Sequence, residues 1–357
     1  MQDIEKLLCP AGDGVYAIHT AKDKRNDLQK KLYGATESAV ERSWLTSLKD
    51  MEKSQNLLLG ICSDTGGGIL RGANWGPMFI RHEMLKRNSR NYLDIGDIRV
   101  IPHLLHDKYL NSATIKECRL ALYKTANTNL PVSPLSITEL VTKELYKNYP
   151  DKRIFALGGD HSVSYPLVKN YLQAKKIQQK RVAVIHFDAH TDLLDKRLGI
   201  DICFGSWTYH ILQYLEEKDD LIQIGIRSTG NTKQHWESSF GIQQIWAKEV
   251  KTMGATKIAE QICKQLQKKQ VTELYISFDI DAIDQAYVSA TGTPEPNGLM
   301  PEDALQIIQN LKQNFAITGG DLVEVAPMVN RLQANNRVSE PDSTLTIAAA
   351  ILQAMTD

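Results

Sequence analysis

Short apolar runs alternate with longer amphipathic stretches along most of the 357-residue chain. The runs are rich in β-branched and aliphatic residues, which is typical of strands that are buried on both faces. They cover residues 57–62, 92–95, 153–157, 182–187, 221–226, 274–278 and 321–325. Between them lie stretches long enough for crossover helices, at residues 134–149, 165–176, 206–217, 255–269 and 301–313. This alternation predicts an α/β domain with a mostly parallel sheet.

The first 55 residues have a different pattern. They are polar and rich in Lys and Glu, with a helical periodicity at residues 36–51 and little strand signal. We therefore expect an N-terminal helical extension, residues 1–55, followed by one large domain, residues 56–357. The extension is expected to pack against that domain or against another subunit.

The composition of the chain limits the kinds of molecule that it is expected to bind. The chain has 42 basic and 42 acidic residues, so there is no net positive field to attract nucleic acid or an anionic membrane surface. No apolar run approaches the ~18 residues that span a bilayer, and the start resembles no signal peptide. Five scattered cysteines form no C-x-x-C pair and are expected to be buried thiols. We expect a cytoplasmic protein with a small-molecule substrate.

Polar side chains gather where three of the predicted strands end. These motifs are residues 158–162 (Gly-Gly-Asp-His-Ser), 188–192 (Asp-Ala-His-Thr-Asp) and 279–281 (Asp-Ile-Asp). Ligands of open parallel sheets bind beyond the carboxyl ends of the strands, and alternate side chains of an extended segment share a face. Six side chains are therefore expected to converge: His161, Asp188, His190, Asp192, Asp279 and Asp281.

This set of side chains indicates a metal centre. Four buried carboxylates repel one another unless positive charge lies between them, and two divalent cations would supply it. Carboxylates and imidazoles without thiolates suit manganese, although iron, cobalt, nickel and zinc remain open. Two such ions ~3.5–4 Å apart lower the pKa of a bridging water from ~15.7 towards ~7, which indicates metal-assisted hydrolysis.

With these motifs the sequence resembles the ureohydrolases, the family of arginase, agmatinase and guanidinobutyrase. The resemblance extends from Leu57 to the C-terminus through further motifs at residues 94–97 (Asp-Ile-Gly-Asp), 225–228 (Gly-Ile-Arg-Ser), 290–294 (Ala-Thr-Gly-Thr-Pro) and 322–325 (Leu-Val-Glu-Val). It implies a three-layer αβα fold of the arginase/deacetylase type with two Mn²⁺ ions per subunit. It also implies a homo-oligomer, either a trimer or a hexamer.

The resemblance further implies a role for each side chain. Each metal would have two ligands of its own and two shared carboxylates: His161 and Asp192 at one ion, His190 and Asp281 at the other, and Asp188 and Asp279 as bridges. Glu324 would pair with the guanidinium group of the substrate. Metal-bridging hydroxide would add to the guanidinium carbon, and Asp192 and the metals would stabilise the tetrahedral intermediate before urea and an amine are released.

Three positions depart from the pattern of arginase. Phe204-Gly205 replaces the His-Gly pair whose histidine is thought to transfer protons, and His210 is the nearest substitute. Leu194 replaces an asparagine that helps to hold the amino-acid end of arginine. The segment after Arg227 also lacks a second arginine-selective carboxylate. Agmatine or another guanidino compound is therefore expected at least as much as arginine.

Two other readings of the same motifs stay open. One is hydrolysis of a different amidine, formimidoylglutamate, and the other is a non-catalytic paralogue that binds metal. Two further segments are interpreted as structural: His186, expected to be buried and hydrogen-bonded rather than a ligand, and Gly66-Gly67-Gly68, expected to form a loop near the cleft because no P-loop Lys or Ser/Thr follows it.

Overall fold

The computed structural model describes residues 2–15, 21–35, 37–65, 70–87, 90–329 and 343–357. Its centre is one nine-stranded sheet with the strand order β1-β3-β2-β4-β9-β8-β5-β6-β7. The strands are β1 (Leu8–Cys9), β2 (Asn56–Gly60), β3 (Leu93–Ile98), β4 (Arg153–Leu157), β5 (Val182–Phe187), β6 (Leu221–Ile226), β7 (Gln243–Trp246), β8 (Glu273–Asp279) and β9 (Ala316–Val323). All neighbouring pairs are parallel except β1 with β3.

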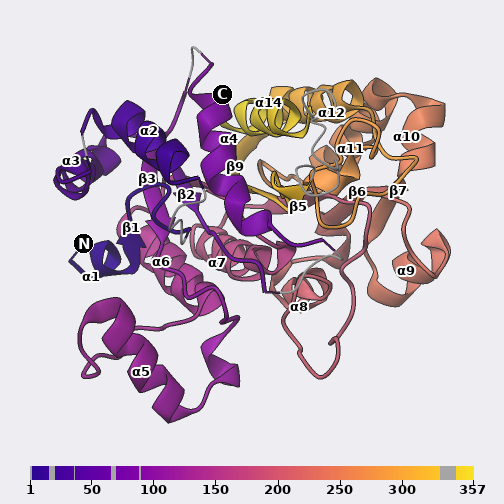
Figure 1. The fold of residues 1–357 in the computed structure, drawn as a ribbon. Helices are drawn as coiled ribbons and strands as arrows, with labels where there is room; N and C mark the ends of the chain where they lie inside the picture. The colour runs from indigo at the N-terminus through magenta and orange to yellow at the C-terminus, as the bar shows by residue number, and fades with distance from the viewer. Residues whose placement is uncertain (1, 16–20, 36, 66–69, 88–89, 330–342) are drawn as a thin grey trace.

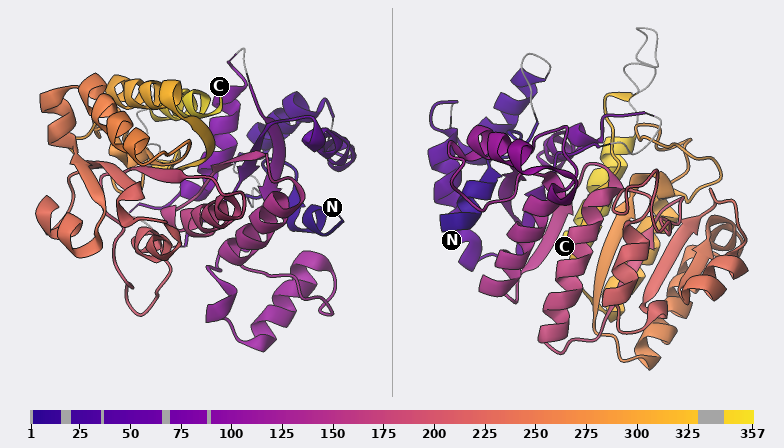
Figure 2. Two further views of the ribbon diagram at one scale, coloured as in Figure 1. Left: turned by 180° about the vertical axis from the view of Figure 1, so that it is seen from behind. Right: turned by 90° about the horizontal axis from the view of Figure 1, so that it is seen from below.

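Helices cover both faces of this sheet, as Figures 1 and 2 show. One layer contains α4 (Gly76–Met84), α10 (Ala247–Met253), α11 (Ala255–Lys268), α12 (Pro301–Asn314) and α14 (Thr344–Thr356). The other contains α6 (Pro134–Asn148), α7 (Ser164–Ile177) and α8 (Trp207–Ile211). Among the described residues no helix combines the length and the apolar composition needed to cross a membrane. The predicted three-layer αβα fold is confirmed.

Side chains alternate between the two faces of each strand, so a separate hydrophobic core lies on each face of the sheet. In β5, Ala183, Ile185 and Phe187 face the α11/α12/α14 layer, whereas Val182 and Val184 face the α6/α7 layer. Each strand is buried on both faces, which is why its sequence reads as a continuous apolar run rather than as an alternation. All seven predicted strand regions contain an observed strand.

The N-terminal segment is more than a set of helices. It contains α1 (Gln2–Leu7), α2 (Lys22–Tyr33) and α3 (Val40–Ser47), of which only α3 lies within the helical pattern at residues 36–51. It also adds β1, which pairs antiparallel with β3 through Leu8↔Ile98 and Cys9↔Asp97. A two-residue strand has no periodicity that a sequence pattern could reveal.

Other elements also differ from the prediction. The helix expected over residues 206–217 ends at Ile211 and continues as a short 3-10 turn, Leu212–Tyr214. The four-residue edge strand β7, with two glutamines among its residues, was not predicted. Several helices were also not assigned from the pattern: α4, α5 (Ser112–Tyr123), α9 (Lys233–Phe240), α10 and α14. In α5 and α9 no residue is buried, so neither carries a strong apolar stripe.

A buried ion cluster joins the N-terminal segment to the sheet. Arg81 on α4 is 1% exposed and contacts Asp94 through Nε and Nη2, at 2.7 and 2.9 Å, and Asp97 through Nη1 at 2.5 Å. The other oxygen of Asp97 accepts the backbone N–H groups of Gly12 and Gly14, at 2.8 and 3.1 Å. One guanidinium therefore balances two buried carboxylates, one of which anchors the N-terminal segment.

Replacing Arg81 by methionine should lower the free energy of unfolding by about 3–5 kcal/mol, because two buried carboxylates lose their counter-ion. Urea denaturation followed by circular dichroism measures this change. The matched control is Lys86→Met, since Lys86 forms an exposed ion pair with Glu83, and such pairs contribute about 0–1 kcal/mol. Equal losses in the two variants would contradict the assigned role of Arg81.

Candidate metal centre

The candidate ligands lie at the carboxyl ends of four adjacent central strands, in the order β4-β9-β8-β5. These ends are level, because Leu157 pairs with Leu322, Leu322 with Phe278, and Phe278 with Phe187. Three of the segments that follow carry the sequence motifs, and the fourth, after β9, carries Glu324. The structure therefore brings together all six predicted ligands and Glu324.

A first group forms around His161, which lies in a 3-10 turn directly after β4. Its Nδ1 atom is 3.1 Å from Asp188 Oδ2, 3.2 Å from Asp192 Oδ2 and 3.1 Å from Asp279 Oδ2. All four side chains are buried. The preceding Gly159 permits this turn, because a Cβ there would lie 1.5 Å from the backbone oxygen of Ser63.

A second group shares Asp188 with the first. His190 Nδ1 lies 3.3 Å from Asp188 Oδ1 and 3.2 Å from Asp281 Oδ2. Backbone and side-chain donors hold both carboxylates in place: Asp188 Oδ1 accepts His190 N–H at 2.6 Å, and Asp281 accepts Ala189 N–H at 3.1 Å and the Thr293 hydroxyl at 2.8 Å. Two histidine–carboxylate groups joined by one carboxylate match the geometry expected of a two-ion centre.

The Nδ1 atom of His161 tests whether a cation fits. Ser277 Oγ donates to Asp321 at 2.7 Å, so it accepts a hydrogen bond from His161 Nε2 at 3.1 Å. The ring proton then lies on Nε2, and the Nδ1 lone pair faces the three carboxylate oxygens without a hydrogen-bond partner in the described part of the chain. Burial lowers the pKa of His161, but hydrogen bonds to Asp188 and Asp279 outweigh it and raise that pKa well above its usual value. The four atoms therefore attract positive charge at one point, and with an unprotonated Nδ1 the residues present fit a metal ion.

His186 holds Asp188 from behind. Gln223 Nε2 donates to the Thr191 carbonyl at 2.7 Å and to His186 Nδ1 at 3.0 Å, which leaves the ring proton on His186 Nε2. That nitrogen donates to Asp188 Oδ2 at 2.8 Å. Burial lowers the pKa of His186, in keeping with a neutral ring. The expectation of a buried, hydrogen-bonded His186 is confirmed, and such support is a usual way to orient a metal ligand.

Charges in the centre oppose one another. Burial and the neighbouring Asp188 raise the pKa of Asp192 to about 8, and burial and Asp281 raise the pKa of Asp279 well above its usual range. Burial also disfavours the charged form of Asp188, but the surrounding imidazoles outweigh it and hold that pKa well below normal. Without added positive charge, these carboxyl groups are therefore not all ionised at neutral pH.

Asp192 and Glu324 have left-handed backbone conformations, with φ of 51° and 61°. Residues other than glycine rarely adopt this conformation, which costs of order 1–3 kcal/mol and is concentrated at functional sites. Both side chains are held by specific contacts. Trp207 Nε1 donates to Asp192 Oδ2 at 2.9 Å, and the backbone N–H of His161 donates to Glu324 Oε1, also at 2.9 Å.

A cleft of about 390 Å³ opens above this group. Its floor includes His161, Asp192, Asp279 and Glu324, and its outer wall includes Leu194, Phe204, Asn231 and Trp236. Two of the positions that depart from arginase, Leu194 and Phe204, therefore lie in the wall of the cleft. Arg197 lies beyond Phe204, with its guanidinium carbon 4.8 Å from the ring centre.

The structure does not bring His210 into this cleft. His210 lies on α8, where its Nε2 atom contacts the Asp195 carbonyl at 2.9 Å, and it is not among the residues that line the cleft. Its role in proton transfer stays a prediction. The Gly66-Gly67-Gly68 loop lies outside the described residues.

Several supporting residues were missed by the sequence analysis. Glu295 Oε1 lies 3.6 Å from His190 Nε2 and accepts the Ser228 hydroxyl at 2.9 Å. It directly follows the motif at residues 290–294, which we noted only as part of the resemblance. Ser277, Gln223 and Trp207 were not identified, because their contacts with the centre arise from the tertiary fold and leave no local pattern in the sequence.

Comparison with known proteins agrees with this geometry. The model of the arginase family matches residues 54–356. The chain is 32% identical over 272 residues to a human protein named guanidino acid hydrolase, mitochondrial, covering 75% of this chain and 70% of that protein. It is 34% identical over 279 residues to chicken agmatinase, mitochondrial, covering 76% and 73%.

Solved structures show the same fold. The agmatine ureohydrolase of Thermoplasma volcanium superposes with a TM-score of 0.63 at 24% identity, covering 85% of this chain and 89% of that one. The arginase of Bacillus caldovelox gives a TM-score of 0.63 at 20% identity, covering 85% and 98%. Fold and relatives together define a hydrolase. The chain belongs to the arginase family.

Replacing Asp188 by alanine should lower the metal content to about one ion per chain or none, because this carboxylate contacts both histidine groups. Metal analysis after equilibration with manganese and gel filtration gives the number. The control is Asp195→Ala, whose side chain is exposed and which follows the same strand. Full metal content in the Asp188 variant would refute this assignment of the site.

Proposed function

We propose that this protein hydrolyses a guanidino compound to urea and an amine at a centre that holds two manganese ions. The observation that carries the proposal is the pair of histidine–carboxylate groups joined by Asp188, with His161 Nδ1 unsatisfied among three carboxylate oxygens. His161, Asp192, His190 and Asp281 would hold the ions individually, and Asp188 and Asp279 would be shared. When bound, the pair of ions supplies a hydroxide nucleophile at neutral pH.

We propose that Glu324 orients the substrate. It lines the cleft and is fixed by the His161 backbone N–H, on the same floor as Asp192 and Asp279. A carboxylate matches the planar, paired N–H groups of a guanidinium well. Burial and Asp279 raise the pKa of Glu324, and a bound guanidinium would lower it again because an opposite charge favours the ionised form. Binding of the cation and ionisation of Glu324 are therefore mutually reinforcing.

The wall of the cleft supports a substrate whose tail is mainly hydrocarbon. Leu194, Phe204 and Trp236 line the cleft with apolar side chains, and Leu194 stands where arginase has an asparagine that holds the amino-acid end of arginine. Trp236 is held by a hydrogen bond from its Nε1 to Thr229 at 2.9 Å. Such a wall suits the methylene chain of agmatine or of a linear guanidino acid better than the branched, doubly charged end of arginine. Two relatives are named agmatinase and guanidinobutyrase, and these names refer to substrates with such a methylene chain.

Assembly and location complete the proposal. We expect a trimer or hexamer and a cytoplasmic location, as the resemblance and the composition indicate. The human and chicken relatives carry the word mitochondrial in their names, so the location of this chain needs its own measurement. Analytical ultracentrifugation and imaging of a tagged chain provide these measurements.

A urea-release screen tests the reaction. With manganese, we expect release from agmatine or from a linear guanidino acid such as 4-guanidinobutyrate, and at least about tenfold lower kcat/KM with arginine, since one lost polar contact costs 1–3 kcal/mol. A parallel assay for formamide from formimidoylglutamate tests the alternative amidine. Manganese-loaded protein that is inert toward all these compounds would overturn the proposed reaction.

Replacing Glu324 by glutamine should lower kcat/KM by about 30-fold or more while the metal content stays unchanged, because a buried charge pair with the guanidinium is lost. Steady-state kinetics with the substrate found in the screen measures the effect. Glu302→Gln on the exposed side of α12 is the matched control. Activity close to wild type in the Glu324 variant would show that another group orients the substrate.

A further inference from the structure

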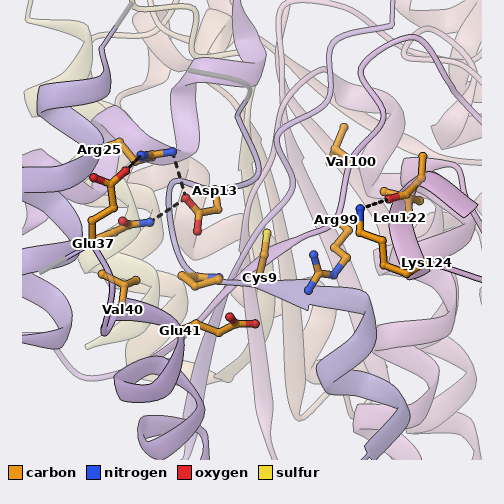
Figure 3. Close-up of a pocket in the computed structure, with 13 residues that line it drawn as sticks. Cys9, Asp13, Arg25, Glu37, Val40, Glu41, Arg99, Val100, Leu122 and Lys124 are labelled. Carbon is orange, nitrogen blue, oxygen red and sulfur yellow. Dashed lines mark hydrogen bonds and ion pairs between the residues drawn. The ribbon is translucent and has the colours of Figure 1, made fainter. Parts of the chain in front are cut away.

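A second cavity, of about 470 Å³, lies between the N-terminal segment and the body of the protein (Figure 3). Its walls come from the segment around β1, from α2 and α3, from the end of β3 and from the end of α5. It shares no lining residue with the cleft above the metal centre. Its volume falls within the ~300–1,000 Å³ range of sites for small molecules.

This cavity is not inherited from the matched part of the family. Most of its lining residues precede residue 54, where the match to the family model begins. The catalytic body supplies the remaining wall, through Arg99, Val100 and the end of α5. A ligand bound here would therefore contact both the N-terminal segment and the domain that carries the metal centre.

On one side of the cavity the charges are already paired. Arg25 lies 3.5 Å from Asp13 and 3.4 Å from Glu37, and Asp13 also accepts a hydrogen bond from Gln29 at 2.9 Å. Figure 3 shows these contacts as a closed group at the edge of the cavity. Lys22 Nζ also lies 3.8 Å from Glu37, so two cations face two carboxylates on this side of the cavity.

The middle of the cavity is different. Glu41 on α3 and Arg99 after β3 extend toward the same central space in Figure 3, with Cys9 between them. Within the described residues neither side chain forms an ion pair; Arg99 Nε donates to the Lys6 carbonyl at 2.9 Å, which leaves the terminal nitrogens of its guanidinium for a ligand. Lys124 adds a second positive charge on the Arg99 side. An anion and a cation thus face one cavity from separate elements without contacting each other.

Apolar side chains also contribute to the walls of the cavity. Val40, Val100 and Leu122 line the cavity together with Pro10. Such a surface favours a short hydrocarbon chain, which gains about 0.8 kcal/mol for each methylene group that it buries. We propose that this cavity binds a small zwitterion, with its amino or guanidino group at Glu41 and its carboxylate at Arg99 and Lys124.

Isothermal titration of the full-length, manganese-loaded protein tests this proposal, with 4-aminobutyrate and 6-aminohexanoate as probes. Butylamine and butyrate each carry one of the two charges and serve as comparators. We expect at least one of the two zwitterions to bind about tenfold or more tightly than either comparator, because it engages both ends of the cavity. Glu41→Gln and Arg99→Gln should each weaken that binding by about tenfold or more.

Two controls separate this site from other binding. Arg42→Gln changes an exposed neighbour of Glu41 that does not line the cavity, and it should leave the affinity unchanged. The double exchange Glu41→Arg with Arg99→Glu should regain binding, since a flexible zwitterion can lie in the reverse direction. Binding that survives in both single variants, as carboxylate binding at the metal centre would, or no detectable heat at about 10 mM probe, would overturn the proposal.

Discussion

Crowding of four carboxyl groups at the ends of neighbouring strands is the constraint on which the rest of the molecule depends. Asp188, Asp192, Asp279 and Asp281 are buried within reach of two imidazoles, and like charges so close cannot all persist without compensation. Hydrogen-bond donors around these carboxyl groups partly compensate their negative charge. Backbone N–H groups and the hydroxyl of Thr293 hold individual oxygens, so the carboxyl groups keep their positions rather than spreading apart.

The parallel sheet makes that crowding possible. Four adjacent strands end at one level, and each continues into a turn that begins with a polar residue or a glycine. Two of these turns use left-handed backbone at Asp192 and Glu324, whose side chains are held by Trp207 and by the backbone of His161. Behind them, the chain of amides from Gln244 through Gln223 to His186 connects the centre with the edge of the sheet. The sheet therefore fixes the positions of the candidate ligands more firmly than loops alone would.

Sequence pattern predicted the interior of this molecule better than its margins. The central strands and the convergence of His161, Asp188 and Asp281 follow from apolar runs and their polar ends, since burial on both faces leaves a strong signal. The margins leave a weak one: β7 is short and half polar, and β1 has two residues. Supporting contacts such as Ser277 with His161 join residues 116 positions apart, so no local pattern contains them.

The short antiparallel strand β1 has a consequence for the solution behaviour of the chain. It pairs with Asp97 and Ile98 on the outer side of β3, so the backbone of β3 is covered at its carboxyl end. A six-residue parallel strand with unpaired N–H and C=O groups is a template for pairing between molecules, whereas a two-residue border offers little for another chain to extend. The N-terminal segment thus covers part of this edge, and a chain trimmed to the part that matches the family model, residues 54–356, would expose the whole outer side of β3.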